Sequence, residues 1–163
     1  MSTKFYTTLT VATAAALAMA GTSASAHHSR TQQQCVAVTE AQVNAQFQRF
    51  NDGFQTRNPD VMVPLFSRNA VLLPTVSGQM RTDAAGIRAY FVDFLPNAPF
   101  GTITESETTI GCNMATRVGN WTVRLTNPTT GVSTDVAARF SFVYTYEDGD
   151  WKILHLHSSA RPN

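Results

Sequence analysis

The sequence predicts an α+β domain in which a curved antiparallel sheet wraps around helices near its N-terminus. Apolar residues recur at helical spacing up to about residue 95, and from about residue 101 they alternate with a period of two. The dipeptide Asp148-Gly149 between two alternating segments is a strong signal for a two-residue hairpin turn. Helices packed on one face of an antiparallel sheet give an α+β fold with a cavity at the open end of the sheet.

The first 26 residues have the features of a cleaved signal peptide. Lys4 is followed by a short apolar stretch from Thr8 to Ala20 and by the small-residue site Ala24-Ser25-Ala26. We therefore expect an exported protein, periplasmic or secreted, without a membrane anchor after cleavage. Residues 27–38 are polar and Gln-rich and predict a flexible lead, and the domain is expected over residues 39–160.

The composition argues against a nucleic-acid partner. The chain of 163 residues has 12 basic and 11 acidic residues, and removal of Lys4 with the signal peptide leaves 11 of each (12 − 1 = 11). A net charge of zero offers no one-sided basic surface for phosphate groups.

Three helices are predicted from caps and apolar stripes. Thr39 and Gln42 form a capping box, and the stripe after it predicts core residues Val43, Phe47, Phe50 and Phe54. Asn58-Pro59 predicts the start of a second, short helix with Val61, Met62, Leu65 and Phe66 facing inward. A short strand follows over residues 70–73. Thr82-Asp83 then caps a third helix with an apolar face of Ile87, Tyr90, Phe91, Phe94 and Leu95.

Four long strands are predicted over residues 101–110, 112–126, 134–147 and 150–159. The turn at Asp148-Gly149 pairs Glu147 with Asp150, and regular pairing then fixes two faces. One face joins Phe140 with His157, Phe142 with His155, Tyr144 with Ile153, and Tyr146 with Trp151. The other joins Arg139 with Ser158, Ser141 with Leu156, and Val143 with Leu154. The aromatic face is expected inside, and the face with Arg139, Leu154 and Leu156 is expected to meet a second subunit.

The two cysteines of the exported chain, Cys35 and Cys112, predict a disulfide, because neither has further metal ligands at close spacing. Closing a loop of roughly 78 residues stabilises a fold by roughly 4 kcal/mol in the chain-entropy model.

Several stretches resemble one known family. Gly86–Phe91, Val123-Arg124-Leu125-Thr126 and Asp148–Ser159 look like the association (hub) domain of calcium/calmodulin-dependent protein kinase II. The resemblance covers residues 36–162. It extends to the stand-alone bacterial relatives of this domain, which are SnoaL-like proteins of the SgcJ/EcaC type.

The resemblance implies a nuclear-transport-factor-2-like (NTF2-like) cone with a deep pocket, often assembled as a dimer or a larger ring. It implies neither kinase activity nor calmodulin binding. In the hub domain, cavity arginines hold a carboxylate. Arg124 falls on one of them, whereas Phe142 and Ser158 occupy the positions of the other two, and Arg139 is the nearest substitute.

Beside a purely structural role in the last strand, His155 and His157 allow three functional interpretations. A metal site requires a third ligand, which their face lacks, and His27-His28 alone is weak evidence for one. Catalysis requires a nucleophile or an acid–base pair, and the one carboxylate of the central strands, Asp135, is expected to pair with Arg124. The third interpretation is a pocket that binds a small molecule.

We therefore expect a self-associating domain without a metal or cofactor, whose cavity binds a small organic molecule with a carboxylate or carbonyl end. The expected lining is Phe47, Tyr90, Phe142 and Trp151, with polar contacts from Arg124, Arg139, His155 and His157. The alternative is a small SnoaL-like isomerase, hydratase or oxidoreductase that uses a cavity histidine. The sequence assigns no catalytic residue.

Overall fold

A computed structural model of the chain describes Met1, Thr3 and residues 34–162. The remaining residues of the predicted signal peptide, His27, His28 and most of the predicted lead lie outside the described residues. None of the helices in the described part has the length and apolar character of a membrane-spanning segment.

The first helix, α1 (Glu40–Gln55), begins at the predicted capping box. Thr39 Oγ1 accepts a hydrogen bond from the Gln42 amide at 3.3 Å, and Gln42 Oε1 accepts one from the Thr39 amide at 2.8 Å. The predicted stripe is buried, namely Val43, Phe47, Phe50 and Phe54. The helix therefore supplies an aromatic ridge to the interior.

The shorter helices follow the predicted caps. Asn58 caps α2 (Pro59–Met62), which continues into the 3-10 turn η1 (Val63–Leu65). Asp83 caps α3 (Ala84–Phe94), which ends in η2 (Leu95–Asn97). The apolar face predicted for the third helix is buried. The inward orientation predicted for Val61 is wrong, since this side chain is 40% exposed.

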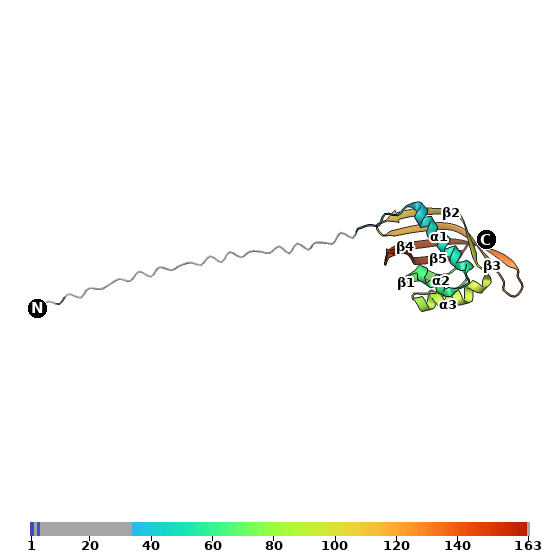
Figure 1. Cartoon of the computed structure of the whole chain (residues 1–163), viewed down its shortest axis with the longest axis horizontal. Coiled ribbons are helices and arrows are strands. Elements are labelled where there is room, and N and C mark those ends of the chain that lie inside the picture. Colours follow the sequence, from blue (N-terminus) through green and yellow to red (C-terminus); the bar gives the residue numbers. More distant parts are fainter. Residues whose placement is uncertain (2, 4–33, 163) are drawn as a thin grey trace. The chain divides into compact units, whose positions relative to one another are not determined.

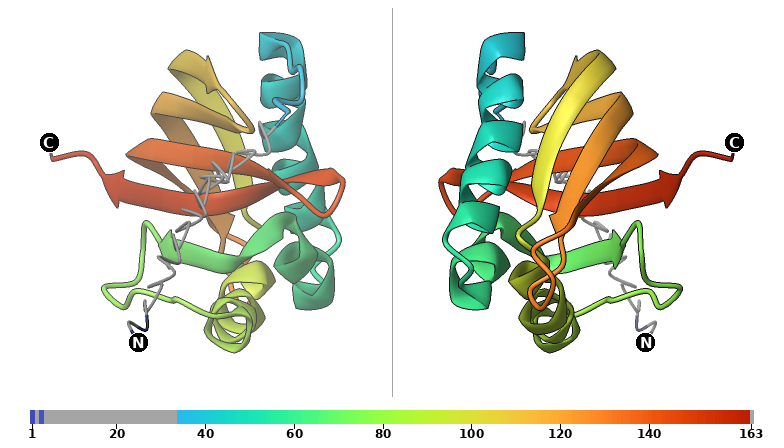
Figure 2. Two further views of the ribbon diagram at one scale, coloured as in Figure 1. Left: turned by 90° about the vertical axis from the view of Figure 1, so that its left-hand side faces the viewer. Right: turned by 90° about the vertical axis from the view of Figure 1, so that its right-hand side faces the viewer.

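Five strands form one bent sheet in the order β1-β5-β4-β3-β2, with the helices on its inner side (Figures 1 and 2). The strands are β1 (Phe66–Leu73), β2 (Phe100–Gly111), β3 (Met114–Thr126), β4 (Ser133–Glu147) and β5 (Asp150–Ala160). β1 pairs in parallel with β5, and the other pairs are antiparallel. The predicted α+β fold is confirmed, with β1 starting four residues before the predicted residue 70.

The β4–β5 hairpin departs from the predicted register. Asp148 and Gly149 form the predicted turn, with φ of 52° and 83°, and pairing is as predicted up to Tyr144 with Ile153. A β-bulge then adds Leu154 to β5, so that Val143 pairs with His155. The extra residue exchanges the two faces of β5 beyond this point.

The predicted placement of the two histidines and of Leu156 is therefore wrong. Leu156 and Ser158 pair with Phe142 and Phe140 and are buried in the interior. His155 and His157 pair with Val143 and Ser141 on the outer face. Burial of a leucine in place of two imidazoles favours this register, because an imidazole without a partner is costly inside a core.

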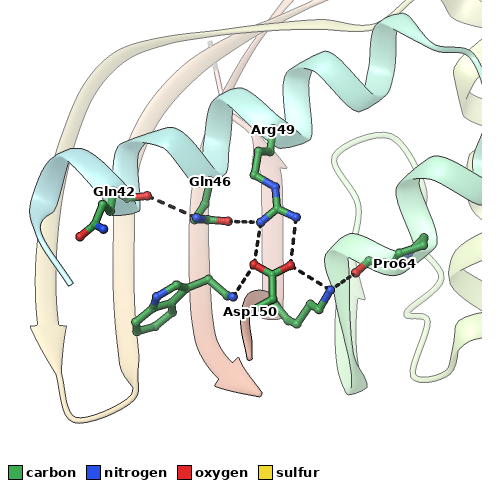
Figure 3. A network of polar contacts seen from close by, with 7 residues as sticks. Gln42, Gln46, Arg49, Pro64 and Asp150 are labelled. Carbon is green, nitrogen blue, oxygen red and sulfur yellow. Dashed lines mark hydrogen bonds and ion pairs between the residues drawn. The ribbon is translucent and has the colours of Figure 1, made fainter. Parts of the chain in front are cut away.

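A disulfide and a network of polar contacts attach α1 and the segment before it to the sheet. The predicted disulfide joins Cys35 to Cys112 in the β2–β3 turn. At the start of β5, Asp150 accepts two hydrogen bonds of 3.1 Å from Arg49 of α1 and one of 3.2 Å from Lys152, which also donates to the Pro64 carbonyl (Figure 3). The hydrogen bonds from Arg49 are the main reason why the pKa of Asp150 is lowered.

Candidate functional site

The inner face of the sheet is mostly aromatic. Phe142 is fully buried at its centre and packs edge-on against Phe47, Phe50 and Trp121, with ring centroids 5.3–6.2 Å apart. Such edge-to-face contacts add to the free energy gained by burial. Phe47 and Phe142, both predicted to line a cavity, are therefore core residues of the described structure.

A small cavity lies between this face and the helices. Its volume is about 20 Å³, enough for about one water molecule. Its lining consists of Phe50, Phe54, Leu72, Pro74, Thr75, Tyr90, Phe91, Phe94, Trp121, Val123, Leu156 and Ser158. The expected deep pocket is thus filled by side chains, and none of the described lining residues is a histidine or a carboxylate.

The polar side chains that line this cavity form hydrogen bonds with one another. Ser158 Oγ accepts hydrogen bonds from Trp121 Nε1 at 3.1 Å and from the Thr75 hydroxyl. These bonds explain how a serine remains buried next to aromatic rings. Ser158 thus supports the packing of Trp121.

Tyr90 is the one residue of the predicted set that lines this cavity. It stacks on Phe94 at 5.1 Å and 19°, and burial raises its pKa. Both rings also line an outer groove of about 200 Å³ with Val76, Ser77, Arg81, Asp93 and Asn97. Tyr90 and Phe94 therefore separate the groove from the interior. Trp151 lies apart, half-buried against Tyr146.

Arg124 lies on the outer face and forms the predicted pair with Asp135. Arg124 Nε and Nη2 donate to the two carboxylate oxygens at 2.8 and 3.0 Å. This hydrogen bonding raises the pKa of Arg124 and lowers that of Asp135. The described structure does not bring Arg124 to the interior.

Arg139 and His157 do come together, but on the outer face. They occupy adjacent cross-strand pairs, Arg139 with Ser159 and Ser141 with His157, and line a shallow hollow of about 320 Å³. Neither residue takes part in an ion pair within residues 34–162. His155 lies beside them, and burial is the main reason why its pKa is lowered.

Arg117 was not among the residues predicted for the site, although it lies on the inner face of the sheet. Every second residue of β3 faces inward, and Arg117 is one of them, together with Ala115 and Trp121. Its guanidinium carbon lies 5.9 Å from the centroid of the Phe47 ring. Burial lowers the pKa of Arg117, and the neighbouring Tyr144 and Glu40 oppose that effect. Alternation from the buried Trp121 was the signal that would have found it.

No group of three or more potential metal ligands occurs among the described residues. His155 and His157 share one face without a third ligand, whereas His27 and His28 lie outside the described residues. The alternative of a small enzyme depended on a histidine in the cavity, whereas His155 and His157 both lie on the outer face.

Comparison with known proteins gives a consistent result. The family model of the calcium/calmodulin dependent protein kinase II association domain matches residues 39–162. A proposed association domain of this kind from Xanthomonas campestris is 35% identical, with 80% of this chain and 97% of that chain covered and a TM-score of 0.73. No curated protein matches the sequence.

More distant structures share the fold alone. A proposed dehydratase of the NTF2-like family from Streptomyces avermitilis is 10% identical over 76% of this chain and 97% of that chain, with a TM-score of 0.68. A ketosteroid isomerase-like protein from Erwinia carotovora is 15% identical over 76% and 96%, with a TM-score of 0.62. The NTF2-like fold is thus common to proteins of different described activities.

Proposed function

The chain belongs to the calcium/calmodulin-dependent protein kinase II association domain family, and on this premise we propose that it is an exported, self-associating module that binds a small organic molecule. Self-association uses the outer face of the sheet, and the small molecule binds in the groove in front of Tyr90.

The observation that carries the proposal is an apolar patch on the outer face of β1, β5 and β4. It consists of Val71, Leu73, Val143 and Leu154, which are half-buried although the helices of residues 34–162 lie on the other side of the sheet (Figure 2). Val71 and Val143 flank His155 on its two neighbouring strands, so the apolar side chains surround this imidazole on three adjacent strands. A group of apolar side chains on an outer face favours a protein partner.

Charge complementarity favours a second copy of the chain as that partner. The outer face is acidic on β2, through Glu105 and Glu107, and basic on β4, through Arg139. In a twofold dimer the same patch is used by both subunits. Opposite charges on the two parts of this face favour a pairing of copies that brings them together.

Export is supported by two features that are independent of each other. The first is the Ala24-Ser25-Ala26 cleavage site after an apolar stretch. The second is the Cys35–Cys112 disulfide, which is typical of an oxidising compartment.

The groove in front of Tyr90 suits a small molecule with an apolar body and an acidic end. Phe94 and Tyr90 provide aromatic surface, and Arg81 provides a cation on the same groove. A ligand here need not enter the filled interior. Small-molecule sites of this type are mostly apolar with a few polar groups.

Sedimentation of the mature protein at micromolar concentration tests the self-association. We expect a dimer or a larger species, and a shift to monomer for Val143→Glu, because a carboxylate in the patch must be desolvated on association. Val92→Glu on the exposed side of α3 is the matched control and keeps the wild-type state. A monomeric wild type contradicts the proposal.

A thermal-shift measurement with benzoate tests the groove. We expect benzoate to raise the melting temperature of the wild type, and Arg81→Gln to reduce this shift. Arg161→Gln, at the exposed end of the domain, is the control and keeps the full shift. Equal shifts for both variants remove Arg81 from the ligand site.

A further inference from the structure

The interior has a polar end that neither the fold nor the proposed function explains. Arg117 and Tyr144 lie on the inner face of adjacent strands, on diagonal positions, since Arg117 pairs with Phe142 and Tyr144 pairs with Ala115. Diagonal neighbours on one face are within reach of long side chains. The guanidinium of Arg117 and the phenol of Tyr144 therefore point into the same region under α1.

Helix α1 adds a third polar group to this region. Arg117 lies over the ring of Phe47 and close to Glu40. Asn44 is between these two residues on one face of the helix, four residues after Glu40 and three before Phe47. This spacing places Asn44 on the face of α1 that bears Glu40 and Phe47, the two helix residues near Arg117.

Two of these groups are buried without a partner. The Tyr144 hydroxyl and Asn44 Oδ1 make no hydrogen bond within the described residues, and Tyr144 is only 1% exposed. Arg117 uses Nε to donate to Ser106 Oγ at 3.1 Å, which leaves its terminal N–H groups without a hydrogen-bond acceptor in residues 34–162. Unpartnered buried polar groups are rare because each loses its hydration without compensation.

The residues opposite this cluster are small. Ala115 pairs with Tyr144, and the inward positions of β2 nearby are Ser106 and Thr108. Arg117 is half-buried, so its side chain is in contact with solvent, whereas the Tyr144 hydroxyl and Asn44 Oδ1 are fully buried.

We propose that Arg117, Tyr144 and Asn44 form a binding site for a small planar oxyanion. The planar guanidinium donates two parallel N–H bonds to two oxygens of such an anion, and the Tyr144 hydroxyl donates a further bond from the floor of the site. Bicarbonate also has an O–H that Asn44 Oδ1 accepts. For nitrate or a carboxylate, a half-turn of the Asn44 amide directs its N–H group inward instead.

The site is independent of self-association, because all of its residues lie on the inner side of the sheet in one subunit. It also differs from the groove in front of Tyr90, which is lined by α3 and the loop before it. The anion site is therefore tested separately from self-association and from binding in the groove.

The test uses the mature protein with sodium nitrate, bicarbonate or acetate, compared with sodium chloride at equal ionic strength. We expect at least one of these anions to raise the melting temperature of the wild type above the chloride value and to give saturable binding by calorimetry. Arg117→Met abolishes this response, and Tyr144→Phe reduces its affinity at least tenfold. Arg68→Met, at an exposed arginine of β1, and Tyr146→Phe are matched controls that keep the response.

Stability without added anion provides the second readout. Tyr144→Phe removes a buried hydroxyl that has no partner, so this variant is expected to melt at or above the wild-type temperature in chloride. The proposal is overturned if the wild type responds to none of the three anions, or if Tyr144→Phe keeps full affinity. It is also overturned if Tyr144→Phe melts well below the wild type and the anions have no effect. The hydroxyl then forms a hydrogen bond with a buried water molecule that stabilises the fold.

Discussion

Strands β3 and β5 have similar lengths and lie on either side of the central strand β4, yet alternation predicts the orientation of side chains in β3 and fails in β5. In β3, alternation is unbroken from Ala115 to Val123, and counting from the buried Trp121 places every side chain. In β5, one extra residue at Leu154 reverses the phase, so that both histidines face outward. Alternation therefore predicts orientation only as far as the pairing remains regular.

The largest effect is expected from a deletion in the regular strand. Removal of Thr122 from β3 forces the residues on one side of the deletion to change faces. If these are the residues that follow position 122, Val123 and Leu125 turn outward and Arg124 turns inward. Exposure of two core side chains and burial of a charge cost more than about 5 kcal/mol together. We expect no cooperative unfolding transition by circular dichroism. A folded deletion variant would show that β3 tolerates a change of phase.

A substitution on the inner face of β3 ranks second. Trp121→Ala is expected to lower the free energy of unfolding by about 3–5 kcal/mol, because it leaves a cavity against Phe47 and Phe140. Urea denaturation measures this difference. Thr122→Ala, on the outer face of the same strand, is the control and changes stability by about 0.5 kcal/mol or less.

Deletion of the extra residue in β5 is expected to be much milder. Removal of Leu154 lets Tyr144–Ile153 continue directly into Val143–His155, so every later pair keeps its partner and its face. The loss is that of one half-buried leucine, about 1–2 kcal/mol. Urea denaturation is again the measurement. If this deletion costs as much as that of Thr122, the bulge is required for the pairing of β1 with β5.

The smallest effect concerns the outward position of His155. Its pKa is lowered, mainly by burial and also by His157, so the folded protein favours the neutral imidazole. The resulting stability is present above the unfolded pKa and is lost as the pH falls through the lower folded pKa. Between about pH 7 and pH 5, the melting temperature of His155→Gln should therefore fall less than that of the wild type. An equal decrease for both proteins assigns the pH dependence to other groups.

Local sequence determined much of this protein. The capping residues Thr39, Asn58 and Asp83 act on backbone amides two or three residues away, so their effect depends on no distant contact. The turn at Asp148-Gly149 is likewise local, because both residues adopt positive φ. The Cys35–Cys112 pairing followed from the number of cysteines, since only one pair was possible.

The tertiary structure decided the candidate site. A bulge depends on both neighbours of a strand, and β5 has to pair with β4 while β1 docks on its other edge, so the phase after Leu154 is a compromise that β5 alone does not encode. The size of the cavity depends on how rings from α1, α3 and the sheet fill a shared volume. For the same reason, only the folded chain brings Arg117 near Tyr144 and near the helix face of Glu40 and Phe47, because helix and sheet positions meet through packing and not through sequence spacing.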